Sequence, residues 1–257
     1  LCRTTNAIVR GDLDTAADSV GAELELGMRL RTQVTDAAVQ SHRLLLAREA
    51  DRMADLAPAI RAARDARPRP NAWDAVLAAA GDVESAEQLA MGAADVVPDD
   101  SYDVFLALSA EVAARRGDAA LGRWCAAQLA SAGDRTMMSG IGTVMLGFAT
   151  HFHGLALAAA GDLRAARVHL MRAADSAGAA EAWLWWAHSQ VELADVLGAL
   201  SDREGAAAAL AAACRSSVMS ASPRLARRVA EVTARHSLRA TATAAAGGRS
   251  RRMPTPR

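Results

Sequence analysis

The stretch that decides the fold runs from residue 154 to residue 173 and reads GLALAAAGDLRAARVHLMRA. Two segments rich in alanine and leucine flank the pair Gly161-Asp162. Glycine readily ends a helix with a positive φ, and an aspartate side chain accepts hydrogen bonds from the free amides that begin the next helix. The stretch therefore predicts two helices joined by a tight turn.

The same turn recurs along the chain. Equivalent Gly-Asp or Ser-Asp pairs stand at residues 11–12, 81–82, 117–118 and 201–202. From Gly81 onward the turns are 36, 44 and 40 residues apart, and the longer interval before Gly81 has room for a degenerate turn near Asp51. A period of about 34 to 45 residues, with two helices in each unit, is typical of an α-solenoid.

The composition also favours helices. Of the 257 residues 52% are hydrophobic, with alanine predominant, only 4% are aromatic, and isoleucine is rare. Alanine is the best helix former. We therefore expect an all-α protein with no sheet. The uncharged stretch 136–161 is long enough to span a membrane, but it contains His151, His153 and several glycines, and we interpret it as a buried helix.

Two units match the pattern of small and large residues of a tetratricopeptide repeat, in which small residues let helices approach and leucines fill the space between them. The matching residues are Gly154, Leu157, Gly161, Ala166, Leu170 and Ala173 in the first unit, and Leu193, Ala194, Leu197, Ala206, Leu210 and Ala213 in the second. We predict a tetratricopeptide-like α-solenoid of degenerate helical hairpins over residues 1–238, with the clearest repeats at 140–214.

Longer motifs resemble a known class of protein. The run Val97-Pro98-Asp99-Asp100-Ser101, the segment 106–113 and the stretch Ala180-Glu181-Ala182-Trp183-Leu184 are similar to the C-terminal helical-repeat region of large bacterial regulators. Those regulators join an AAA-type or STAND ATPase to a LuxR-type DNA-binding domain or to an adenylate cyclase domain. The resemblance implies a protein-interaction or ligand-sensing module. Its partner would be a protein or peptide, in particular an ATPase or output domain of the same parent polypeptide, or a small-molecule effector.

Two other functions stay open. The chain could be the C-terminal part of an ATPase or adenylate cyclase whose catalytic domains lie upstream, or it could be a free-standing scaffold. Chemistry within the chain itself is not expected, because it contains no lysine, which excludes the usual P-loop and Schiff-base enzymes. His151 and His153 are two residues apart and would point to different sides of a helix. We therefore expect no catalytic residue, cofactor or metal.

Tryptophan supplies the candidate interaction surface. On a helix Trp183 and Trp186 share a face, and Trp185 points elsewhere. Either the first two pack in the core with Trp185 partly exposed, or Trp185 lines a groove, since exposed tryptophan is enriched at binding hot spots. The candidate surface comprises Trp185, Trp183, Arg164 and Arg167.

The C-terminal segment 239–257 is small, polar and arginine-rich, and we expect a disordered basic tail. Such an arm can bind nucleic acid through counterion release. Because no aromatic residue or recognition helix accompanies it, a solvated tail is favoured and no nucleic-acid partner is expected. Cysteine occurs three times without a metal-ligand spacing, and no export signal is visible, so a cytoplasmic location is expected.

Overall fold

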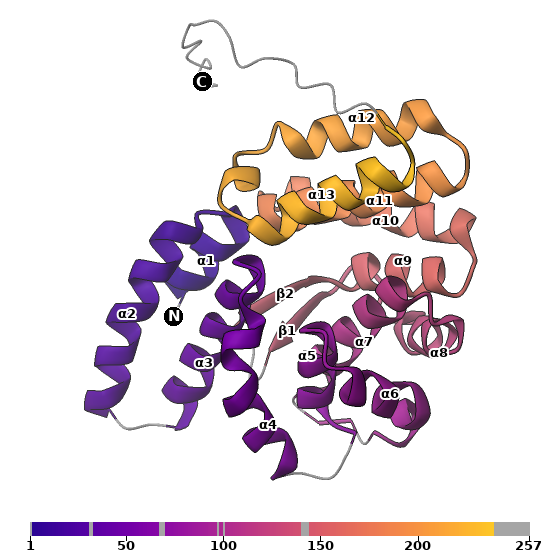
Figure 1. Cartoon of the computed structure of the whole chain (residues 1–257). Coiled ribbons are helices and arrows are strands. Elements are labelled where there is room, and N and C mark those ends of the chain that lie inside the picture. The colour runs from indigo at the N-terminus through magenta and orange to yellow at the C-terminus, as the bar shows by residue number, and fades with distance from the viewer. Residues whose placement is uncertain are drawn as a thin grey trace, which may run out of the picture.

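The computed structural model describes residues 2–30, 33–66, 70–96, 98–99, 101–139 and 144–238, and within these ranges it is mostly helical (Figure 1). The α-helices are α1 (Cys2–Arg10), α2 (Leu13–Leu30), α3 (Gln33–Glu49), α4 (Ala57–Asp65), α5 (Ala72–Ala79), α6 (Val83–Gly92), α7 (Tyr102–Arg116), α8 (Ala119–Leu129), α9 (Ala149–Ala159), α10 (Leu163–Ala179), α11 (Trp183–Ala199), α12 (Arg203–Cys214) and α13 (Pro223–Arg235). Short 3-10 helices span Met53–Leu56, Ala93–Asp95 and Ser217–Ser220. The strands are β1 (Thr136–Ser139) and β2 (Val144–Phe148). The expectation of a helical protein is confirmed, and the predicted tail 239–257 lies outside the described residues.

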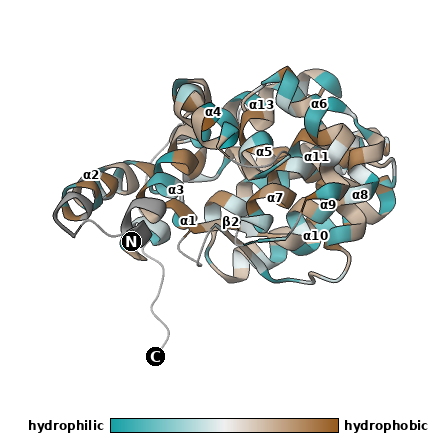
Figure 2. Ribbon diagram, turned by 90° about the horizontal axis from the view of Figure 1, so that it is seen from below, coloured by the Kyte–Doolittle hydropathy of each residue, from teal (hydrophilic) through white to brown (hydrophobic). Residues whose placement is uncertain are grey.

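Helices that follow one another pack together as hairpins. The pairs α1 and α2, α5 and α6, α7 and α8, α9 and α10, and α11 and α12 are all in contact, and α10 also packs against α11. Most helices carry hydrophobic and hydrophilic residues on the same ribbon (Figure 2). In α7, all ten residues from Val104 to Ala113 are buried. This helix therefore lies in the middle of the core.

The predicted turns have the predicted backbone geometry. Gly117 ends α7 with φ 65°, and Ser201 takes a similar value of 66° between α11 and α12 although it is not a glycine. The aspartate that follows each turn begins the next helix: the Asp118 carboxylate accepts hydrogen bonds from the amides of Ala120 and Leu121 at 3.1 and 3.0 Å. The degenerate turn expected near Asp51 is present, with φ 58° at that residue.

Replacing Gly117 by alanine is expected to lower the free energy of unfolding by about 1 to 2 kcal/mol, because a left-handed backbone is costly for a residue with a Cβ. A Cβ at this position meets no atom within 4 Å, so conformation alone sets the cost. Gly21, inside α2, has equally open space and no positive φ. Gly21→Ala should therefore stabilise the protein by roughly 0.5 to 1 kcal/mol. Urea unfolding of both variants measures the two changes in the free energy of unfolding. Changes of the same sign in both variants would contradict the prediction.

The prediction of no sheet, with a single helix over 136–161, was wrong. Strands β1 and β2 form an antiparallel pair, in which Thr136 lies opposite Phe148, and the helix α9 begins only at Ala149. Position 147 shows the physical reason. Gly147 has φ 141°, far from the helical value, and a Cβ there would lie 3.0 Å from the Trp185 ring. No helix therefore runs through this position, and glycine is the residue that fits against the ring. Residues 140–143, between the two strands, lie outside the described residues.

The last helix turns back. Helix α13 packs against α11 and against α3, and α1 also contacts α11. Ser222 caps the start of α13, where its Oγ accepts a hydrogen bond from the Leu225 amide at 3.1 Å. The N-terminal helices and the last helix thus lie side by side in space (Figure 1).

Candidate interaction site

Trp185 does not belong to the surface. Its side chain is fully buried, so both readings of its position, as partly exposed or as lining a groove, were wrong. Its ring packs edge-on against Phe152 and His151 at centroid distances of 6.2 and 6.3 Å, and the Arg48 guanidinium lies over it at 5.5 Å. The β1–β2 hairpin and α3 cover this side of α11. Because no strands were expected from the sequence, the covering of Trp185 was not predicted.

The other three residues of the predicted surface are exposed but do not lie together. Trp183 is 41% exposed and makes an edge-to-face contact with Trp186 at 6.3 Å. Arg164 and Arg167 are exposed near the start of α10. Trp183 begins α11, past the opposite end of α10, which is about 25 Å long at the usual helical rise. The predicted surface is therefore not one patch.

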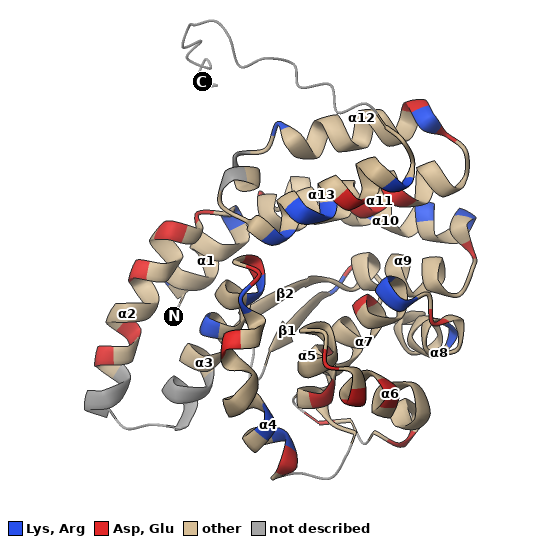
Figure 3. Cartoon of the chain, in the orientation of Figure 1, with Lys and Arg blue, Asp and Glu red and all other residues tan. Residues whose placement is uncertain are grey.

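A different group of residues is brought together where α3, α7, α11 and α13 meet. It consists of Arg48, Glu49, Glu111, His188, Glu192, Arg224 and Arg228, and we call it the charge cluster. The side chain of Glu49 is 0% exposed and that of Glu111 is 5% exposed. Basic residues of α13 face acidic residues of α11 (Figure 3). Charged side chains this well buried require partners.

Glu49 of α3 contacts residues of both α11 and α13. Its carboxylate lies 2.9 Å from His188 Nε2, accepts a hydrogen bond from Ser222 Oγ at 2.8 Å and another from Arg224 Nη1 at 3.2 Å. Burial alone raises the pKa of Glu49, but His188, Arg224 and Arg48 together lower it well below its ordinary value. The carboxylate is therefore ionised throughout the neutral range, and it joins α3 to α11 and α13.

Glu111 joins α7 to the same group. It accepts a hydrogen bond from Arg224 Nη2 at 3.0 Å and forms a second ion pair with Arg48. Burial raises the pKa of Glu111, and the two guanidinium groups outweigh that effect and lower it to about 2. A carboxylate held ionised in this way is a poor general acid at neutral pH.

Further ion pairs extend along α13. Arg228 donates to both oxygens of Glu192 at 2.8 and 2.7 Å and to Asp195 at 2.6 Å. Arg227 donates twice to Asp51, at 2.6 and 3.0 Å. Helix α13 is therefore joined to α3, α7 and α11 by arginine pairs over most of its length.

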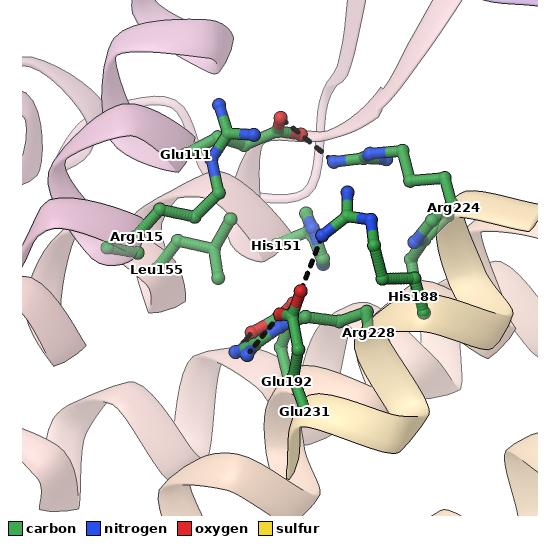
Figure 4. A pocket seen from close by; sticks show the side chains of 11 residues that line it. Glu111, Arg115, His151, Leu155, His188, Glu192, Arg224, Arg228 and Glu231 are labelled. Carbon is green, nitrogen blue, oxygen red and sulfur yellow. Dashed lines mark hydrogen bonds and ion pairs between the residues drawn. The ribbon is translucent and has the colours of Figure 1, made fainter. Parts of the chain in front are cut away.

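Beside the cluster lies an open, polar groove. One part has a volume of about 190 Å³ and is lined by Arg48, Asp51, Glu111, Arg115, Arg224 and Arg227 among others. Figure 4 shows the smaller pocket that adjoins this groove, where the Glu111 carboxylate pairs with Arg224 of α13 near His151, His188 and Glu192. Pockets that enclose a drug-sized ligand measure about 300 to 1,000 Å³, so this space fits a side chain or a small charged group better than a large effector.

The histidines of α9 face different neighbours, as their spacing predicts. His151 Nδ1 lies 3.0 Å from Ser189 Oγ of α11, and the His153 ring stacks on His169 of α10 with centroids 4.1 Å apart. Within the part of the chain that the structure describes, no three histidine, cysteine or carboxylate side chains converge as metal ligands would.

Acid should destabilise the protein in two ranges of pH. Burial lowers the pKa of His151 from 6.5 to about 4. As the pH falls from 6.5 to 4, the unfolded chain takes up a proton that the folded chain does not, and stability falls. The pKa of Glu111 is likewise lower in the folded state, so a second loss follows between about pH 4.5 and 2.

Thermal melting between pH 7.5 and 4.5 tests the first range with His151→Asn, which does not titrate and whose amide nitrogen stands close to the place of Nδ1, the ring atom that contacts Ser189 Oγ. The melting temperature of this variant should fall less than that of the unsubstituted protein. If the melting temperature falls equally with pH in the two proteins, His151 does not contribute to the loss of stability in acid.

Among the described residues, none of the helices combines the length and the apolar character needed to cross a bilayer. Comparisons of the chain with protein-family models, with curated proteins and with solved structures found no match. The assignment of function therefore rests on the sequence and on the geometry of the charge cluster and its groove.

Proposed function

We propose that the chain is a non-catalytic, tetratricopeptide-like α-solenoid that serves as the protein-interaction or ligand-sensing module of a bacterial transcriptional or signalling regulator. Its consecutive helical hairpins and the recurrence of one turn geometry, with a positive φ at Gly81, Gly117, Gly161 and Ser201, support the repeat architecture. Arrays of this kind bind partners along extended surfaces.

The observation that carries the proposal is the charge cluster. Its members come from α3, α7, α11 and α13, so one polar site touches helices from the N-terminal, central and C-terminal parts of the chain. Its carboxylates have lowered pKa values and lie against arginines. Such groups recognise and position other charged groups rather than transfer protons at neutral pH. A partner that changes these pairs shifts the packing of distant helices together.

The partner that we favour is a protein or peptide. The groove is smaller than an enclosed ligand pocket, and it opens beside exposed arginines such as Arg115 and Arg227. The resemblance to ATPase-linked regulators indicates an ATPase or output domain of the same parent polypeptide, in the cytoplasm.

Two measurements test the proposal. The purified chain should neither hydrolyse ATP nor form cyclic AMP, and it should co-elute in size-exclusion chromatography with the ATPase segment encoded in the same reading frame. Nucleotide turnover that persists through purification and disappears on a point substitution in this chain would contradict the non-catalytic assignment. The absence of a complex with that segment would contradict the proposed partner.

A further inference from the structure

Helix α13 contacts the rest of the described chain largely through ion pairs. It contains four arginines and one glutamate in thirteen residues. The arginines contact acidic residues on α3, on the turn after α3, on α7 and on α11, namely Glu49, Asp51, Glu111, Glu192 and Asp195. We call these five residues the acidic surface.

The apolar part of the contact is small. Only Leu225 and Val232 of α13 are fully buried, seven residues apart on one face. In α11, by comparison, ten side chains are buried. Two ion pairs of α13, Arg227 with Asp51 and Arg235 with Asp195, involve arginines that are 45% and 56% exposed, and salt weakens such pairs. The pairs of Arg224 and Arg228 are largely buried and are screened much less. Helix α13 is therefore the described helix whose attachment depends most visibly on charge.

The acidic surface stays partly paired when α13 is removed. Glu49 keeps His188 and Arg48, and Glu111 keeps Arg48. Glu192 and Asp195 pair with α13, and they would face water once it leaves. No deeply buried carboxylate of the surface is then left without a partner, which makes release of the helix feasible.

Building on the proposed function, we propose that the acidic surface is the docking site for an arginine-bearing amphipathic helix of a partner protein, and that α13 occupies this site in cis as a displaceable ligand. The partner helix presents arginines at the positions of Arg224, Arg228 and Arg235, which are four and seven residues apart. It places apolar side chains at the positions of Leu225 and Val232. Helical spacing puts these residues on one side.

The geometry selects arginine over lysine. Arg228 uses Nε and Nη2 on the two oxygens of Glu192. This two-point contact matches the planar guanidinium fork and is not available to a lysine ammonium. Charge also decides the class of partner, because a surface of five carboxylates repels a nucleic acid or an acidic peptide.

A labelled synthetic peptide of residues 222–238 serves as the probe. The double variant Arg224→Gln/Arg228→Gln of the full chain weakens the competing α13, so it should bind the peptide about tenfold more tightly than the unsubstituted chain. Adding Glu192→Gln should remove that gain, and a peptide carrying Arg228→Lys should bind more weakly. Arg164→Gln, on the exposed side of α10, is the control and should bind as the unsubstituted chain does. A folded double variant that does not bind the peptide overturns the proposal.

Hydrogen exchange of the unsubstituted chain gives a second test that needs no variant. Raising the salt from about 0.05 to 0.5 M should speed exchange of the α13 amides and leave α11 and α12 unchanged, because screening weakens surface charge pairs. If α13 exchanges together with α11 and α12 at both salt concentrations, α13 is not displaceable and the proposal fails. Both tests measure only the acidic surface. If they fail, the proposed complex with the ATPase segment is not contradicted. If that complex alone is not observed, the proposed docking site is not contradicted.

Discussion

Leu170→Asp should lower the free energy of unfolding by at least about 4 kcal/mol, a large share of the 5 to 15 kcal/mol that ordinary domains possess. Leu170 has no exposed surface, and it fills the space above Gly154 of α9, where a Cβ would lie 2.6 Å from its Cγ. An aspartate here loses that packing and buries a carboxylate in a seam of small apolar residues. Neighbouring hairpins should unfold with it, since each packs on the next.

The neighbouring residue supplies the control. Met171 follows Leu170 on α10 but is 46% exposed, so Met171→Asp should cost within about 0.5 kcal/mol, as surface substitutions do. Urea unfolding followed by circular dichroism measures both variants. Similar losses in the two would show that α10 does not bury the face that the structure gives it.

Glu49→Ala should cost about 3 to 5 kcal/mol, because removing one member of a buried ion network leaves its partners charged and poorly solvated. The carboxylate of Glu49 contacts His188, Arg224 and Arg48. Alanine also leaves a small cavity between α3 and α13. The loss should be accompanied by weaker docking of α13, seen as faster hydrogen exchange of its amides.

An exposed pair provides the comparison for Glu49. Glu181 pairs with Arg10 at 2.9 Å, and both side chains are more than half exposed. Glu181→Ala should therefore change stability by no more than about 1 kcal/mol. If Glu49→Ala costs no more than Glu181→Ala in thermal and urea unfolding, the charge cluster does not hold the helices together.

The sequence predicts features that depend on neighbouring residues, and it does not predict contacts between residues that are far apart in the chain. The turns at Gly117 and Ser201 follow from neighbouring residues, and the structure confirms them. The β1–β2 hairpin was missed because the uncharged stretch 136–161 was interpreted as one buried helix. Gly147 of this hairpin packs closely against Trp185, 38 positions further along the chain, and no local pattern indicates such a distant contact.

One residue of the charge cluster, Glu111, can be recognised from the sequence as a buried carboxylate. Glu111 stands within a run of buried residues on α7, and a carboxylate surrounded by apolar positions has to find a cation. Its partners Arg48 and Arg224 are 63 and 113 positions away. No local pattern relates positions so far apart, so the sequence could indicate that Glu111 is paired but not which residues pair with it.

The contact between Glu49 and Arg224, which are 175 positions apart, also sets an order of events during synthesis. A ribosome adding about 5 to 20 residues per second needs roughly 10 to 35 s to travel that far. For most of this interval α3 has been made while α11 and α13 have not. Glu49 therefore stays hydrated and without His188 and Arg224 until α11 and then α13 have emerged.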